Sequence, residues 1–194
     1  MSFHAGFLLP SLLGLLATAP IATAQEKSPA PAAPAQTNPM IAFNKTAYTH
    51  LRGWVLRSAE KMPEADYKFK PTDAVRSFGQ LIGHVADAQY MFCSVARGEK
   101  NPTPNVEQAK TSKADLVAAL KDAAAYCDVA YDGMTDASAY QTVKMFQSDL
   151  PKLAVLYAND MHCAEHYGNI VTYLRLRDIV PPSTEERSQA QPKK

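Results

Sequence analysis

The sequence lacks an excess of charge of either sign. Its 20 lysine and arginine residues are nearly matched by 19 aspartate and glutamate residues, which gives a formal net charge of +1 at pH 7. No run of basic residues occurs inside the region that we expect to fold. Because proteins that bind nucleic acid need a basic surface to contact phosphates, the composition argues against nucleic acid as a partner.

The sequence also lacks the short motifs that identify many enzymes and organic cofactor sites. It contains no nucleophile elbow, no glycine-rich phosphate loop, no recognisable paired-carboxylate motif and no Cys-x-x-Cys spacing. Each of these motifs carries a defined mechanism. Their absence leaves the catalytic residues and the substrate unspecified, and it predicts no organic cofactor.

No hydrophobic run is long enough to span a membrane. The apolar stretch over residues 7–19 is shorter than the roughly 20 apolar residues of a transmembrane helix. Ala22-Thr23-Ala24 is typical of a signal-peptidase site, and the first cysteine, Cys93, is too distant for a lipoprotein anchor. We therefore predict a cleaved signal peptide over residues 1–24, a periplasmic or secreted location, and no stable membrane insertion after cleavage.

Composition separates two terminal segments from the domain. Residues 25–39 are rich in alanine and proline, which favours an extended tether. Residues 181–194 are polar, which favours a flexible tail. Residues 40–180 remain, and this length is typical of one domain with a single hydrophobic core.

Cysteine is scarce as well, and its number is odd for a chain that we expect to be exported. Cys93, Cys127 and Cys163 lie in three different predicted helices. The pattern is consistent with a Cys93–Cys127 disulfide between neighbouring helices. It is equally consistent with small buried thiols, and the sequence does not choose between them.

No stretch alternates polar and apolar residues with a sustained period of two, so little or no sheet is expected. Four helices are predicted instead, over residues 40–61, from between 72 and 77 to about 96, from about 112 until Gly133, and from 148 or 149 to about 177. Thr72 or Asp73 is the expected cap of the second helix. We predict an extended connection over residues 67–71, and a short helical turn or irregular crossover over 134–146. The predicted fold class is an all-α four-helix bundle.

Two of the five histidines, His162 and His166, stand four residues apart on the last predicted helix. Residues with this spacing lie one turn apart on the same face, so their imidazoles can chelate one transition metal. Their line also contains Asn159 and Asn169, and a core-facing strip of this polarity is costly unless its groups have partners. A pair of surface histidines that binds no metal is the alternative interpretation.

A third histidine, His84, falls inside an apolar row of the second predicted helix. In a bundle it would lie opposite the pair on the last helix and could complete a metal site. Taken alone, His84 is more simply a core histidine that is hydrogen-bonded to a backbone carbonyl.

Other polar residues near the pair are weaker candidates. We expect Asn159, Asn169 and Asp160 to supply hydrogen bonds to the metal ligands, with the two asparagines favoured because they share the histidine line. His50 on the first predicted helix is a weak candidate for a fourth ligand. Cys163 lies about 100° around the helix from its neighbour His162, so direct ligation in the same site is not expected.

Segments around these histidines resemble the signatures of the DinB family. They are Ser77–Asp87, which contains His84, and the stretch from His162 through Tyr173-Leu174-Arg175 to Pro181-Pro182. The resemblance covers residues 40–183. It implies a four-helix bundle, often a homodimer, in which His84, His162 and His166 bind a divalent metal such as zinc or nickel. Some relatives are metal-dependent thiol transferases, and the mycothiol-dependent maleylpyruvate isomerase has a similar domain. The family name does not imply DNA binding.

Three neutral imidazoles without a fourth protein ligand leave coordination positions open, which is typical of catalytic metal sites. We therefore expect a metal-dependent hydrolase or transferase of an unknown small molecule, with zinc or nickel as the preferred ion and iron or manganese as alternatives. Cytosolic thiols are scarce outside the cytoplasm, which disfavours thiol transfer by an exported chain. A second interpretation is a non-catalytic bundle in which the ion ties two helices together, and a third is a bundle without metal.

Overall fold

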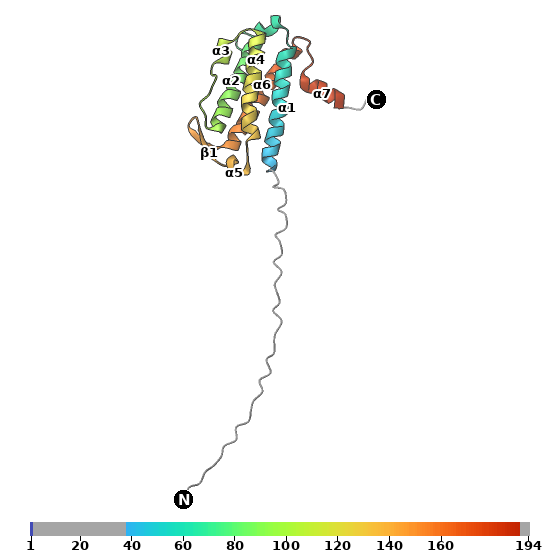
Figure 1. The fold of residues 1–194 in the computed structure, drawn as a ribbon. Helices are drawn as coiled ribbons and strands as arrows, with labels where there is room; N and C mark the ends of the chain where they lie inside the picture. Colours follow the sequence, from blue (N-terminus) through green and yellow to red (C-terminus); the bar gives the residue numbers. More distant parts are fainter. Residues whose placement is uncertain (2–37, 191–194) are drawn as a thin grey trace. The chain divides into compact units, whose positions relative to one another are not determined.

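The computed structural model describes residue 1 and residues 38–190. The predicted signal peptide and nearly all of the predicted tether lie outside these described residues. Four long helices run side by side in the described part of the chain (Figure 1): α1 (Pro39–Lys61), α2 (Phe78–Arg97), α4 (Lys113–Asp132) and α6 (Lys152–Arg175). The predicted all-α four-helix bundle is confirmed.

The core of the bundle is apolar, and all four long helices contribute to it. Fully buried side chains include Val55 of α1, Ile82 of α2, Leu120 of α4, and Leu156 and Ile170 of α6. Burying an aliphatic side chain of this size contributes about 1.5–3 kcal/mol relative to leaving it in water. Helix α2 packs against both α4 and α6, so the helix that carries His84 lies beside the helix that carries the other two histidines.

The helix ends follow local capping chemistry. Helix α2 begins at Phe78, because the Ser77 hydroxyl accepts a hydrogen bond from the Gln80 backbone N–H and the Gln80 side-chain oxygen accepts one from the Ser77 backbone N–H. The prediction of Thr72 or Asp73 as its cap is therefore wrong. Gly98 ends α2 in the left-handed conformation, with φ of 71°.

The connections hold several short elements. They are the 3₁₀ helix η1 (Glu64–Lys68), α3 (Val106–Ala109), α5 (Asp136–Ala139), and the antiparallel strands β1 (Thr142–Met145) and β2 (Ser148–Pro151). Helix η1 replaces the first part of the connection that was predicted to be extended. The last long helix begins at Lys152, three to four residues later than predicted, because residues 148–151 pair with β1. Among the described residues, no helix has the length and apolarity needed to cross a membrane.

Two further features fix the bundle. A disulfide joins Cys93 of α2 to Cys127 of α4, with Cα atoms 5.2 Å apart, whereas Cys163 is a buried free thiol. Helix α7 (Pro182–Ala190) occupies most of the segment that was predicted to be a flexible tail. It is anchored to α1 by polar contacts, since Glu186 accepts a hydrogen bond from the Trp54 indole N–H at 2.7 Å. The sequence prediction missed this helix because only Pro182 of its residues is buried.

Candidate metal centre

The three histidines singled out in the sequence lie together in the bundle. Nε2 of His162 lies 3.2 Å from Nε2 of His84 and 3.1 Å from Nε2 of His166. The potential ligand atoms of all three residues lie within 4.8 Å of one another. Helix α6 therefore supplies two nitrogens one turn apart, and α2 supplies the third from the facing helix.

Polar side chains lie beside the Nδ1 atoms of His84 and His166, on the side of each ring away from the cluster. Nδ1 of His84 lies 3.3 Å from Oε2 of Glu107. A neutral imidazole carries one N–H, and a carboxylate only accepts hydrogen bonds, so the proton of His84 belongs on Nδ1. The Nε2 lone pair of His84 then faces the other two histidines. Nδ2 of the Asn169 side-chain amide lies 3.4 Å from Nδ1 of His166, so Asn169 also borders the cluster.

This donor set fits a divalent transition metal. Lone pairs that converge on one point repel each other unless a cation lies between them. Three nitrogens bound tetrahedrally at 2.0–2.1 Å would be about 3.3 Å apart, which is close to the observed 3.1 and 3.2 Å separations. The residues present can therefore hold such an ion without rearrangement of the helices.

The environment keeps these imidazoles neutral. Burial lowers the pKa of His162 to about 4, and the neighbouring His166 and His84 add to the shift. Burial is also the main cause that lowers the pKa values of His84 and His166. Neutral imidazole is the form that binds metal, so the cluster is available as a ligand set at neutral pH.

Glu107, which contacts His84, was not among the residues predicted from the sequence, and α2 holds it in place. Gly83 permits the approach, because a Cβ atom there would lie 2.6 Å from the Glu107 Cα. One turn later, the Asp87 carboxylate accepts hydrogen bonds from the backbone N–H groups of Val106 at 2.6 Å and Glu107 at 2.9 Å. Helix α3 has four residues, too few for a periodic pattern, so no signal in the sequence places Glu107 beside His84.

Two of the expected partners lie elsewhere. Asp160 accepts hydrogen bonds from Asn44 of α1 and Tyr131 of α4, and Asn159 donates to the same tyrosine hydroxyl. Within residues 38–190 neither residue hydrogen-bonds to a histidine, so the prediction that they support the metal ligands is wrong. Burial raises the pKa of Asp160 to about 7. Of the three polar residues proposed, the structure places only Asn169 at the cluster.

The two remaining candidates also lie outside the cluster. His50 is exposed on α1, where its ring lies 5.9 Å from that of Trp54. Cys163 is buried, and its sulfur accepts a contact from the Gln89 amide at 3.8 Å. Neither residue belongs to the group of side chains that could hold an ion in the described part of the chain.

The histidine cluster borders two cavities. One has a volume of about 290 Å³ and is lined in part by His166, Asn169 and Arg76. The other has a volume of about 300 Å³ and is bordered by His84 and His162. A small molecule can therefore reach the cluster, which is not sealed within the core.

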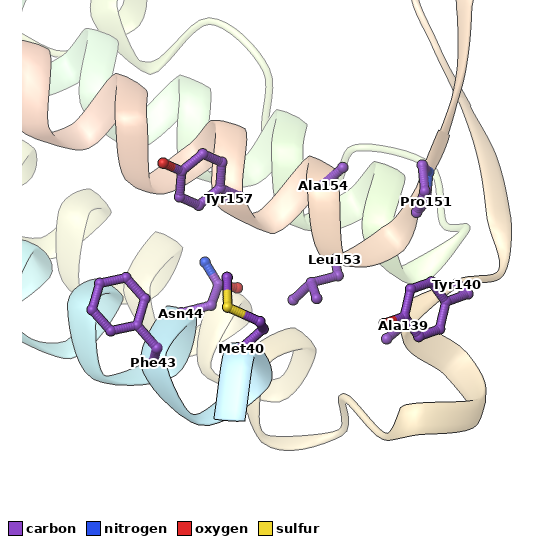
Figure 2. A pocket seen from close by; sticks show the side chains of 9 residues that line it. All are labelled: Met40, Phe43, Asn44, Ala139, Tyr140, Pro151, Leu153, Ala154 and Tyr157. Atoms are coloured by element: carbon purple, nitrogen blue, oxygen red, sulfur yellow. The ribbon is translucent and has the colours of Figure 1, made fainter. Parts of the chain in front are cut away.

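A separate apolar pocket of about 360 Å³ lies between α1 and α6 (Figure 2). Phe43 of α1 and Tyr157 of α6 stand on its two sides, and Tyr140 closes one end. No histidine lines it. Its walls offer little for acid–base or metal chemistry, so the candidate site is the histidine cluster.

Comparison with known proteins agrees with the fold. A family model described as the DinB superfamily matches residues 47–170. A DinB-like protein from Bacillus cereus superimposes with a TM-score of 0.65 at 13% identity, over 73% of this chain and 95% of that protein. A DinB-like protein from Bacillus subtilis gives a TM-score of 0.58 at 20% identity, over 73% of this chain and 92% of that one.

A third similar structure is the mycothiol-dependent maleylpyruvate isomerase, with a TM-score of 0.57 at 16% identity. The match covers 67% of this chain and 60% of the isomerase. At these identities the likeness establishes the fold alone. No curated protein matches the sequence.

Proposed function

The chain belongs to the DinB superfamily, and from this premise we propose that it is a metal-dependent hydrolase or transferase with one divalent ion bound by His84, His162 and His166. The observation that carries the proposal is that the Nε2 atoms of three neutral histidines lie close together beside two cavities. Nε2 of His162 lies 3.2 Å from that of His84 and 3.1 Å from that of His166. A closed structural site would have four protein ligands and no adjoining cavity.

When bound, the ion would supply a Lewis acid that polarises a substrate oxygen or thiol. The protein side chains would prepare the site for it. Glu107 holds the proton on Nδ1 of His84, which fixes the orientation of that ring. The amide nitrogen of Asn169 lies 3.4 Å from Nδ1 of His166 and borders the site on that side. The cavities would admit the substrate to the open face of the cluster.

We propose zinc or nickel as the ion, with iron or manganese as alternatives, because imidazole ligands suit several of these metals. We also propose that the protein acts in the periplasm or outside the cell. The Cys93–Cys127 disulfide supports that location, because disulfides persist mainly in oxidising compartments. The same location argues against a cytosolic thiol as the co-substrate.

A non-catalytic role for the ion is the second candidate function. An ion bound to His84 of α2 and to the two histidines of α6 would connect helices that already pack against each other. In that case the ion would mainly contribute folding free energy. The two bordering cavities favour the catalytic role, since a purely structural ion has no need of them.

Turnover assays on metal-reconstituted protein would separate the two functions. Esters, lactones and amides would test hydrolysis, and thiol acceptors added to activated esters would test transfer. We expect metal-dependent turnover that is absent from the His162→Ala/His166→Ala variant and retained by His50→Ala, which removes an exposed histidine outside the site. Stabilisation by metal without turnover of any tested class would support the structural role instead.

A further inference from the structure

Arg76 is the one positively charged residue bordering either cavity beside the histidines, among the residues that the structure describes. It shares its cavity with His166, Asn169 and Tyr173. We propose that Arg76 and Asn169 form a subsite for the carboxylate group of a small organic acid, which is thereby positioned against the histidine cluster. This inference rests on the proposed function, because it names the substrate class of the same site.

The structure holds Arg76 at the cavity from both its backbone and its side chain. The backbone carbonyl accepts a hydrogen bond from the Tyr173 hydroxyl at 2.6 Å. The side-chain Nε donates to Oε1 of Glu107 at 3.0 Å. The first contact holds the backbone of Arg76 and the second restrains its side chain, so less conformational entropy is lost when the side chain binds a ligand.

The terminal nitrogens of this guanidinium remain available for a ligand. Among residues 38–190, the Nε bond to Glu107 is the only hydrogen bond that the Arg76 side chain makes. The side chain is 43% exposed. Nη1 and Nη2 of an arginine present N–H groups in a planar fork, and this geometry matches the two oxygens of a carboxylate.

The two cavities differ in the charged residues that border them. The cavity at His84 and His162 is bordered by Asp87, whose carboxylate repels an anion even though it accepts two backbone N–H bonds. The other cavity has the Arg76 cation at its wall, beside His166. An anion bound to Arg76 would therefore lie beside the histidine cluster.

The lining of the cavity at Arg76 indicates which charge and polarity its ligand should have. Among the described residues, Arg76 is the only cationic side chain at this cavity, so the protein itself offers one positive charge, which matches a singly charged carboxylate better than a phosphate with nearly two negative charges. Val75, Leu81 and the Tyr173 ring supply apolar surface. The expected ligand is an organic acid with a short apolar or aromatic part, and its size is limited by a cavity of about 290 Å³.

Binding of benzoate and of its neutral counterpart benzamide tests the proposal without relying on turnover. Affinities would be measured by isothermal titration calorimetry, or by chemical-shift changes in NMR spectra, with the metal-reconstituted protein and with the metal-free protein. In both forms we expect Arg76→Gln to weaken benzoate binding about tenfold or more, because a charge-assisted hydrogen bond is lost. Arg76→Lys should weaken it less, and benzamide binding should not change.

Arg177→Gln is the matched control. Nε of Arg177 forms an ion pair with Asp66 at 3.0 Å and its side chain is 37% exposed, so it resembles Arg76 in its acidic partner and its exposure while lying outside the cavity. It should leave benzoate binding unchanged. Equal benzoate affinity in wild type and Arg76→Gln, an equal loss in Arg177→Gln, or no benzoate binding to wild type would overturn the proposal.

Metal content measured on the same samples separates the two proposals. If Arg76→Gln keeps its metal and binds benzoate as wild type does, the carboxylate subsite is wrong while the metal-dependent function stands. If wild type binds no metal but still binds benzoate through Arg76, the proposed function fails and the subsite stands.

Discussion

Oε2 of Glu107 lies 3.3 Å from Nδ1 of His84, although the two residues are on different helices and 23 positions apart in the chain. This contact places the proton of His84 on Nδ1 and its lone pair on Nε2, the atom that faces the other two histidines. Partners of this kind commonly change metal affinity by 10–100-fold when they are removed. The contact therefore connects a carboxylate on the short helix α3 to the metal-binding capacity of the bundle.

We expect Glu107→Ala to weaken metal binding by roughly tenfold or more, because His84 loses the acceptor that fixes its tautomer. Competition with a chromogenic chelator would measure the dissociation constant. Glu99→Gln is a suitable control, since Glu99 is an exposed glutamate that is also paired with an arginine, Arg97, but lies away from the histidines. Unchanged metal affinity in Glu107→Ala would show that the contact does not support the site.

Gly83 should tolerate no side chain. In Gly83→Ala the new Cβ would meet the Glu107 Cα at 2.6 Å, so α3 must move away from α2 and carry Glu107 with it. Overpacking of this kind typically costs about 1–3 kcal/mol of unfolding free energy. We expect both a lower urea midpoint and weaker metal binding.

Gly53→Ala is the matched control for that experiment. Gly53 lies inside α1, and nothing is within 4 Å of the Cβ that alanine would add. Alanine is better than glycine in a helix interior by roughly 0.5–1 kcal/mol, so this variant should be as stable as wild type or slightly more stable. Equal effects of the two substitutions would contradict the close packing of α3 on Gly83.

The stability of the metal-free protein should depend on pH through His162. Its pKa falls from an ordinary value of 6.5 to about 4 in the folded protein, so the unfolded chain binds more protons between these two values. Unfolding free energy therefore rises with pH across this window. The contribution of His162 is fully present above pH 6.5 and is lost as the pH falls toward 4.

A difference measurement isolates this contribution. Asp160 shifts in the opposite direction, to about 7, and it alone would make stability fall as the pH rises from about 4 to 7. Urea unfolding of wild type and His162→Gln should therefore be compared at several pH values. The wild-type advantage should shrink as the pH falls from 6.5 to 4, and a constant difference would refute the assignment.

The disulfide should contribute substantially to stability. Cys93 and Cys127 are 34 residues apart, and closing a loop of that length in the unfolded chain corresponds to about 3–4 kcal/mol in the chain-entropy model. We expect a Cys93→Ser/Cys127→Ser variant to have a markedly lower urea midpoint. Reductant should lower the midpoint of wild type to a similar value and leave the variant unchanged. A wild-type midpoint that does not respond to full reduction would contradict this account.

The long-range layout followed from the sequence because it depends on strong local signals. His162 and His166 share one face of α6 because of their i, i+4 spacing, and His84 belongs to an apolar row of α2. Any bundle that packs α2 against α6 on these faces brings the three histidines together. Helix ends marked by Gly98 or Ser112 were also predictable, since their capping chemistry is local.

The parts that were missed depend on tertiary contacts. Asp160 and Asn159 are close to His162 in sequence, but packing turns them toward Tyr131 and Asn44. Glu107 and Arg76 come from segments without a periodic pattern. Glu107 reaches His84 because α3 packs on Gly83, and Arg76 is held by its contacts with Glu107 and Tyr173. A one-dimensional pattern carries no information about such approaches.

Metal content measured by elemental mass spectrometry tests the central claim most directly. The mature protein would be purified without chelator or affinity tag, beside the His162→Ala/His166→Ala variant and the His50→Ala control. We predict about one divalent ion per chain in wild type and in the control, and none in the double variant. If wild type holds no ion, even after incubation with zinc, nickel and manganese salts, the three histidines are not a metal site and the proposed function is wrong.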